Sequence, residues 1–249
     1  MVFNGILLRL FFKKKTIGTA LLLVFHSCIT IAEILNTFGL WYFAFVSEES
    51  ILSKISELAF VLFYAVGYLF LYIFANRHIL QDNDMVKGFT TTILSLIVGV
   101  IFGIMIGEII FGVENPILSM TFLMEGVNIN QTLPNILGGS LLLVPIFLAI
   151  HLRIVIKIVS LRKTLDRGIT RTSFTTVLLS IIFFIASTLF ATGFTIPGIG
   201  EHPYVIVTFH TLRTLSIMFG LFLGYLGWIR PNWFKETIAK KYNIPIEEE

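Results

Sequence analysis

Residues 201–230 read EHPYVIVTFHTLRTLSIMFGLFLGYLGWIR. The apolar part of this stretch, residues 203–229, is long enough to cross a bilayer, because a helical span needs about 20 residues. His210 and Arg213 lie three residues apart, so they share one face of that helix. An ionisable side chain at membrane depth needs a partner or water. The stretch therefore predicts a bundle of membrane helices with a polar site inside it.

The composition of the whole chain agrees with a membrane protein. Of its 249 residues, 56% are hydrophobic and only 13% are charged, whereas a typical soluble domain has about 25% charged residues. No stretch between the apolar runs is long enough to form the core of a large water-soluble domain. The one cysteine, Cys28, lies inside an apolar run, so we expect no disulfide. We predict an all-α, polytopic integral membrane protein.

Six apolar runs predict six transmembrane helices that form one membrane domain over residues 1–249. Residues 1–15 are apolar and end in three lysines, which is typical of a helix that lies in the membrane interface. Residues 230–249 are predicted to be a cytoplasmic tail. The predicted spans are about residues 16–45, 55–75, 88–113, 135–158, 173–194 and 203–229.

The basic residues predict the orientation of these spans. If Lys13–Lys15 are cytoplasmic and the spans alternate in direction, the basic loops and the basic tail also fall inside, as the positive-inside rule requires. The outside loops keep Lys54 and five glutamates: Glu48, Glu49, Glu114, Glu125 and Glu201. We therefore predict a multi-pass protein of the cell membrane with both termini in the cytoplasm.

Small residues recur at every fourth position in two of the predicted spans. Such a spacing makes a groove in which a second membrane helix can approach closely. We expect the third and sixth spans to pack centrally through these grooves. The residues are Ser95, Gly99, Gly103 and Gly107 in the third span, and Ser216, Gly220 and Gly224 in the sixth.

A polar stripe runs along the first span. Its members are His26, Thr30, Glu33 and Thr37, spaced four, three and four residues apart, so they lie on one face of a helix. A stripe of this kind is expected to face protein or a water-filled cavity.

The predicted depths bring several ionisable groups to a similar level in the membrane. Glu33 and Glu108 lie toward the outer half, and a carboxylate near Arg213 is strongly favoured over a charge left alone in low dielectric. The predicted outward-facing pocket for a ligand or proton consists of His26, Glu33, Glu108, His210 and Arg213. The cluster is either a clamp that fixes the register of the helices or a site that responds to a proton or ligand.

An enzymatic interpretation comes from Gly138-Gly139-Ser140 and His210. A glycine-flanked serine in the fourth of six spans and a histidine in the sixth are similar to rhomboid intramembrane proteases, a resemblance that implies Ser140 as nucleophile and His210 as its base. The chain departs from that family's pattern at Leu141 and at Leu212-Arg213-Thr214, where the family has small residues. It also lacks the family's second-span histidine and asparagine between residues 55 and 75.

Other chemistries find little support in the sequence. The histidines at 26, 78, 151, 202 and 210 lie in different segments, without the paired spacing of zinc sites, so we predict no metal. There is no phosphate-binding glycine loop, and we predict no cofactor. The basic loops are explained by topology and by contacts with lipid headgroups, so we predict no nucleic-acid partner.

The C-terminal third carries a second resemblance. A basic stretch, SLRKTLDRGITR at residues 160–171, precedes a Ser- and Leu-rich span, and the last span ends in Gly224-Tyr225-Leu226-Gly227, Arg230-Pro231 and Trp233-Phe234. This pattern resembles the multi-span membrane sensor regions of prokaryotic signalling proteins. It implies a sensor-like fold, and a signalling role would then require a separate partner protein.

The function that we predict is a non-enzymatic, sensor-like or accessory membrane module that responds to a small ligand, to pH or to a partner. A proton-coupled or small-solute transporter that uses the same pocket is the first alternative, and a serine hydrolase that uses Ser140 and His210 is the second. The lipid bilayer is the expected partner, together with a separate signalling or complex protein. The oligomeric state is left open.

Overall fold

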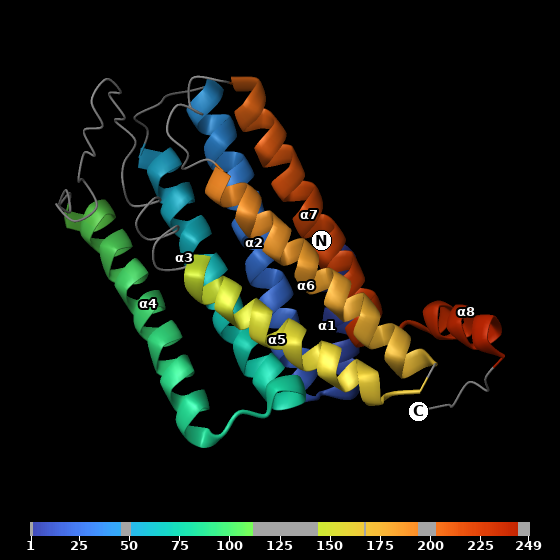
Figure 1. Ribbon diagram of the computed structural model, residues 1–249. Coiled ribbons are helices and arrows are strands. Elements are labelled where there is room, and N and C mark those ends of the chain that lie inside the picture. The colour runs from blue at the N-terminus through green and yellow to red at the C-terminus, as the bar shows by residue number, and fades with distance from the viewer. Residues whose placement is uncertain (1, 46–50, 112–143, 167, 194–202, 244–249) are drawn as a thin grey trace. The chain divides into compact units, whose positions relative to one another are not determined.

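The computed structural model describes residues 2–45, 51–111, 144–166, 168–193 and 203–243, and every regular element in these ranges is a helix (Figure 1). The predicted all-helical fold is therefore confirmed for the described residues. In chain order the elements are α1 (Val2–Lys14), α2 (Ile17–Phe45), α3 (Ile51–Ala75), the π-helical turn η1 (Asn76–Leu80), α4 (Asp84–Phe111), α5 (Val144–Thr164), α6 (Ile169–Gly193), α7 (Pro203–Ile229) and α8 (Asn232–Tyr242).

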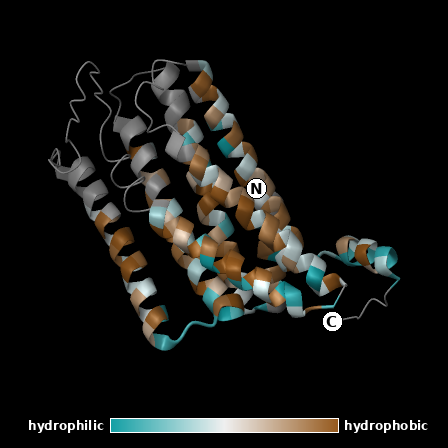
Figure 2. Cartoon of the chain, viewed as in Figure 1, coloured by the Kyte–Doolittle hydropathy of each residue, from teal (hydrophilic) through white to brown (hydrophobic). Residues whose placement is uncertain are grey.

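Three of these helices contain stretches that are long and apolar enough to cross a membrane. The stretches are Ile17–Phe38 of α2, Ile169–Phe190 of α6 and Val207–Ile229 of α7. Figure 2 shows the apolar residues along these helices and the polar residues near helix ends and along α8. The helices α3, α4 and α5 lie where the other spans are predicted, but the total of six spans and the side on which the termini lie stay predictions.

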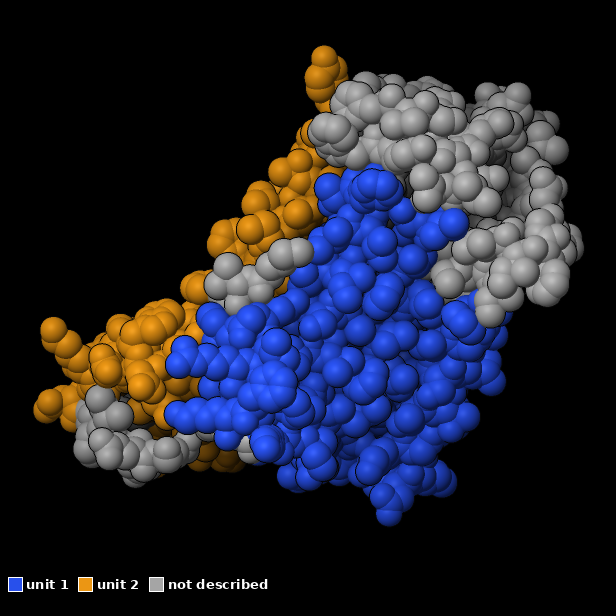
Figure 3. All heavy atoms as spheres, turned by 180° about the vertical axis from the view of Figure 1, so that it is seen from behind, with its two compact units in different colours: residues 1–147 blue, residues 148–249 orange. Residues whose placement is uncertain are grey.

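The contacts within the chain divide it into two compact units, residues 1–147 and 148–249 (Figure 3). Each unit has its own packing, built from helices that follow one another in the sequence. The single membrane domain over residues 1–249 stays a prediction.

In the first unit, α2 packs along α3, while α1 lies against α2 and α4 lies against α3. Phe25 and Ile29 of α2 and Tyr68 and Tyr72 of α3 are buried, and the Tyr68 ring stacks on Phe147 at a centroid distance of 3.7 Å. Gly67 permits the close approach, because a Cβ atom there would lie 3.2 Å from Ile29 Cδ1 and 3.3 Å from Cys28 Cβ. The long helices α2 and α3 thus form the core that positions the polar side chains of this unit.

The connection from α3 to α4 is fixed by its own hydrogen bonds. The side chain of Asn76 accepts a hydrogen bond from the backbone N–H of Asp82 at 2.8 Å, and the Tyr72 hydroxyl donates to Asp82 Oδ2 at 3.1 Å. Gln81 ends the π-helical turn in the left-handed conformation, with φ of 52°. This turn places His78 beside Gly18 of α2, where a Cβ atom would lie only 2.8 Å from the imidazole Nε2.

In the second unit, α6 and α7 pack side by side in antiparallel directions. The Ser180 hydroxyl donates a hydrogen bond to the backbone carbonyl of Gly220 at 2.6 Å. The two helices also approach closely at Gly227, where a Cβ atom would lie 2.5 Å from Val177 Cγ2 and 3.0 Å from the carbonyl oxygen of Ser173. The start of α6 therefore lies beside the end of α7.

The segment after α7 is folded, which the sequence did not predict. Arg230 adopts a left-handed conformation with φ of 51°, which ends α7, and Pro231 precedes the first residue of α8. The helix α8 packs against α6 and buries Ile238 and Ala239. Most of the predicted tail that the structure describes is thus a short helix held on the second unit.

Candidate functional site

A hydrogen bond between two side chains joins α2 to α3. The Tyr64 hydroxyl of α3 donates a hydrogen bond to Glu33 Oε1 of α2 at 3.1 Å, and the bond is partly buried. Glu33 lies within the apolar stretch Ile17–Phe38, five residues from its end, or about 7.5 Å along the helix. A hydrogen bond to an ionised carboxylate is roughly twice as strong as one between neutral groups. The pair therefore ties α3 to the apolar stretch of α2.

The rest of the predicted stripe on α2 is hydrogen-bonded within its own helix. The Thr30 hydroxyl donates to the carbonyl of His26 at 2.8 Å, and the Thr37 hydroxyl donates to the carbonyl of Glu33 at 2.8 Å. Each hydroxyl has one proton to donate, so these two threonines cannot pass protons along the stripe without first breaking those bonds. Of the four residues in the stripe, Glu33 is the one for which the structure shows a side-chain bond to another helix.

His26 is the second ionisable member of the stripe. Its side chain is buried, with the ring edge-on to Phe25 at a centroid distance of 5.3 Å. Its Nδ1 atom is buried and has no hydrogen-bond partner within the described residues. Because seven residues separate it from Glu33, it lies about 10 Å further along the same face of α2.

The predicted residues of α7 lie in the second unit. Arg213 is buried, with an exposed fraction of 4%, and His210, one turn before it, is half-buried. Glu33 belongs to the first unit and the side chain of Glu108 lies outside the described residues. The predicted pairing of Arg213 with one of these glutamates, and with it the five-residue pocket, stays a prediction.

The small residues of α7 are packed against a neighbouring helix, whereas those that the structure describes in α4 are exposed. In α7, Gly220 and Gly224 lie against Phe184 and Ser180 of α6, and Ser216 is buried. The helix α6 therefore lies in this groove, and the central packing of the third and sixth spans stays a prediction. In α4, Ser95, Gly99 and Gly103 are exposed, and a Cβ atom on either glycine would meet no atom within 4 Å. Gly107 lies outside the residues whose side chains are described.

The enzymatic interpretation depends on a residue that the structure does not describe. Ser140 lies in the interval 112–143, so its relation to His210 stays a prediction. Among the described residues, no group of three His, Cys, Asp or Glu side chains is placed to hold a metal ion.

Two aromatic residues carry contacts that the sequence did not predict. Tyr64 was one of many aromatic residues in the second span, and its hydroxyl is now seen on Glu33. His151 of α5 is fully buried, with its ring stacked on Phe184 at a centroid distance of 6.1 Å. The sequence could have indicated a polar contact at Tyr64, because a phenol hydroxyl inside an apolar helix usually finds a hydrogen-bond partner.

One titratable group lies at the α3–α4 connection, outside the apolar stretches. Partial burial of the His78 ring, which lies against Gly18 and 4.6 Å from the Phe74 ring, lowers its pKa, and the neighbouring Arg77 cation lowers this pKa further. The neutral imidazole is therefore the form that the folded chain favours here.

Comparison of the chain with family models, with curated proteins and with solved structures gives no match. The resemblances to sensor regions and to rhomboid proteases therefore stay predictions. Within the first unit, the Glu33–Tyr64 pair joins an ionisable side chain of the apolar stretch of α2 to a second helix.

Proposed function

We propose that the chain is a multi-pass protein of the cell membrane that acts as a non-enzymatic, sensor-like or accessory module. Its responsive site is the pair of Glu33 and Tyr64 between α2 and α3. The observation that carries the proposal is the hydrogen bond of 3.1 Å from the Tyr64 hydroxyl to Glu33 Oε1, formed at the interface of two long apolar helices. Ionisable groups at membrane depth commonly mark functional sites.

The mechanism follows from the charge on Glu33. When the carboxylate is ionised, its charge strengthens the hydrogen bond from Tyr64 and holds α2 on α3. A proton on the Glu33 carboxylate removes its charge and weakens this hydrogen bond. A small cationic or hydrogen-bonding ligand that competes for the carboxylate oxygen atoms weakens it in the same way. The site thereby converts a change in protonation or ligand occupancy into a change in the packing of two helices, which is the kind of two-state element that a sensor needs.

Two neighbouring features support a site that responds rather than a path that conducts. The hydroxyls of Thr30 and Thr37, on either side of Glu33, are held by carbonyls of α2 itself. The buried His26 places a second ionisable side chain on the same face of α2. A response of this kind needs a receiver, and we propose a separate signalling or complex protein in the same membrane.

The experiment compares amide hydrogen exchange of the full chain in lipid vesicles at neutral and acidic pH. We expect the protection of amides in α2 and α3 near Glu33 and Tyr64, relative to the intrinsic exchange rate at each pH, to fall when the pH falls. In the Glu33→Gln variant, which is permanently neutral, this protection should be low at both pH values. Thr37→Val is the matched control, since it removes a hydroxyl that bonds only within α2, and it should behave like the wild type.

Three results would overturn the proposal. The first is the same pH response in wild type and Glu33→Gln. The second is proton flux into the vesicles above that of protein-free vesicles, which would favour transport. The third is labelling of Ser140 by a serine-directed reagent, which would favour the hydrolase.

A further inference from the structure

The helix α8 has one face on the protein and an opposite face that is exposed. Ile238 and Ala239 are buried, and they mark the side that contacts the second unit. Trp233 and Lys240 are seven residues apart, so they lie together on the opposite side of the helix. Trp233 is 52% exposed, and Lys240 is also exposed. An aromatic ring and a cation therefore share the outer face of α8.

The position of α8 is fixed by short connections. The apolar helix α7 ends at Ile229 and α8 begins at Asn232, so the link can span no more than about 10 Å. The helix also packs on α6, whose start lies beside the end of α7 at Gly227. Since α6 and α7 are long and apolar enough to cross a bilayer, α8 lies where the hydrocarbon gives way to the headgroups.

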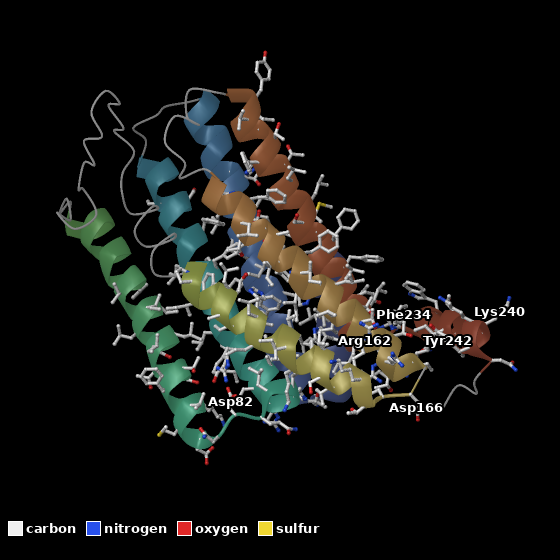
Figure 4. The ribbon with its side chains drawn as sticks, viewed as in Figure 1. Asp82, Arg162, Asp166, Phe234, Lys240 and Tyr242 are labelled. Carbon is white, nitrogen blue, oxygen red and sulfur yellow. The ribbon has the colours of Figure 1, made fainter. Side chains whose placement is uncertain are left out.

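The charges at this end of the second unit are mostly positive. Three lysines and one glutamate occur in α8, whose sequence is NWFKETIAKKY. Arg162 and Lys163 lie in the last turn of α5, and Arg230 lies between α7 and α8. Figure 4 shows Arg162 and Asp166 at the same end of this unit as Phe234 and Tyr242 of α8. A basic surface at headgroup level is complementary to anionic lipids.

We propose that α8 is an interfacial helix that binds anionic phospholipid headgroups. Lys240 and the neighbouring Lys241 contact the lipid phosphates, and Trp233 inserts its ring at headgroup level, where tryptophan is enriched. Lys241 Nζ lies 5.5 Å from the centre of the Tyr242 ring, so a second aromatic group accompanies the cations. This inference rests on α6 and α7 crossing a bilayer and does not depend on the responsive site at Glu33.

The test measures quenching of Trp233 fluorescence by lipids brominated near the headgroup, with the full chain in vesicles. Trp41→Phe and Trp228→Phe leave Trp233 as the only tryptophan. We expect stronger quenching in vesicles that contain phosphatidylglycerol than in pure phosphatidylcholine, and a loss of this difference in high salt, where charges are screened within about 3 Å at 1 M. Lys240→Gln with Lys241→Gln should lower the binding equilibrium of α8 about 25-fold, at about fivefold per lysine.

The matched control is Arg77→Gln with Lys87→Gln, which removes two exposed positive charges from the first unit and should leave Trp233 quenching unchanged. Equal quenching in both kinds of vesicle, or no effect of the lysine substitutions, would overturn the proposal. A ring shielded from both the brominated lipid and aqueous iodide would also overturn it, in favour of a protein or a second copy of the chain on this face. If the chain with Trp41→Phe and Trp228→Phe does not fold, subtraction of the Trp233→Phe spectrum from the wild-type spectrum gives the same comparison.

Discussion

Single residues decide how strongly α2 and α3 are joined. Most of their interface is apolar, and apolar contacts do not distinguish one register sharply from another in a lipid environment. The hydrogen bond from Tyr64 to Glu33 does fix the register of α2 against α3, because it can form only when this phenol reaches this carboxylate. Its energy should therefore be measurable as a coupling between the two side chains.

We expect Glu33→Gln and Tyr64→Phe each to destabilise the protein and the double variant to be less destabilised than their sum. The coupling free energy should be about 1 kcal/mol, within the range found for hydrogen bonds between membrane helices. Equilibrium unfolding in mixed micelles gives all four free energies of unfolding. Additive effects would show that the two side chains do not interact.

His78 gives a prediction for pH. Its pKa in the folded chain lies below the ordinary value of 6.5, chiefly because of burial and then because of Arg77. The unfolded chain therefore binds more protons between these two pKa values, so the stability that depends on neutral His78 is complete above pH 6.5 and is lost as the pH falls through the folded pKa. The free energy of unfolding should fall less steeply with decreasing pH in His78→Gln than in the wild type. Parallel curves would contradict this expectation.

At the scale of helices, close packing depends on where glycine meets a neighbour. Gly227 of α7 lies against backbone atoms of α6, which cannot rotate away as a side chain can. Gly99 of α4 faces open space among the described residues. The same substitution should therefore have opposite effects at the two positions.

Gly227→Ala should destabilise the protein by about 1–3 kcal/mol, because a methyl group would overlap Val177 and the carbonyl of Ser173. Gly99→Ala should be neutral or should stabilise α4 by up to about 1 kcal/mol, because alanine restricts the unfolded chain and favours a helix. Thermal unfolding of the two variants in the same detergent makes the comparison. Similar losses at both positions would contradict the packing of α6 on α7.

Part of this architecture could be predicted from the sequence, and the rest could not, for physical reasons. Long apolar runs placed α2, α6 and α7 closely, since composition and length decide which segments are buried in lipid. A stripe of small residues shows that a groove exists, but it does not show which helix fills it. The small residues Gly220 and Gly224 predict a close neighbour, and only the structure shows that this neighbour is α6.

The partner of Glu33 could not be predicted from the sequence either. Periodicity predicted that Glu33 lies on a polar face of its helix, but it could not show that Tyr64 is the neighbour, because several aromatic residues of the second span carry similar signals. The helix α8 has only 11 residues and a polar composition, so the sequence alone predicts a tail there. Its contacts with α6 hold it in place, and contacts of that kind cannot be seen in a sequence.

At the scale of the whole molecule, the distribution of charge predicts the orientation in the membrane. In a chain without Cys28, single cysteines at Lys163 and at Glu48 lie on predicted opposite sides. A maleimide that cannot cross membranes should label the Glu48→Cys variant in intact cells and should label Lys163→Cys only after the membrane is opened. The reverse pattern would invert the topology, and labelling of both from outside would contradict the spans between them.

The central claim is that Glu33 changes its charge while it is bonded to Tyr64. Infrared difference spectra of the chain in vesicles, recorded between neutral and acidic pH, detect the protonated carboxyl group directly. We expect a carboxyl band that appears on acidification, shifts in Tyr64→Phe because a hydrogen bond is lost, and is absent in Glu33→Gln. A band that is identical in all three proteins, or no band that depends on Glu33 at any pH, would contradict the account.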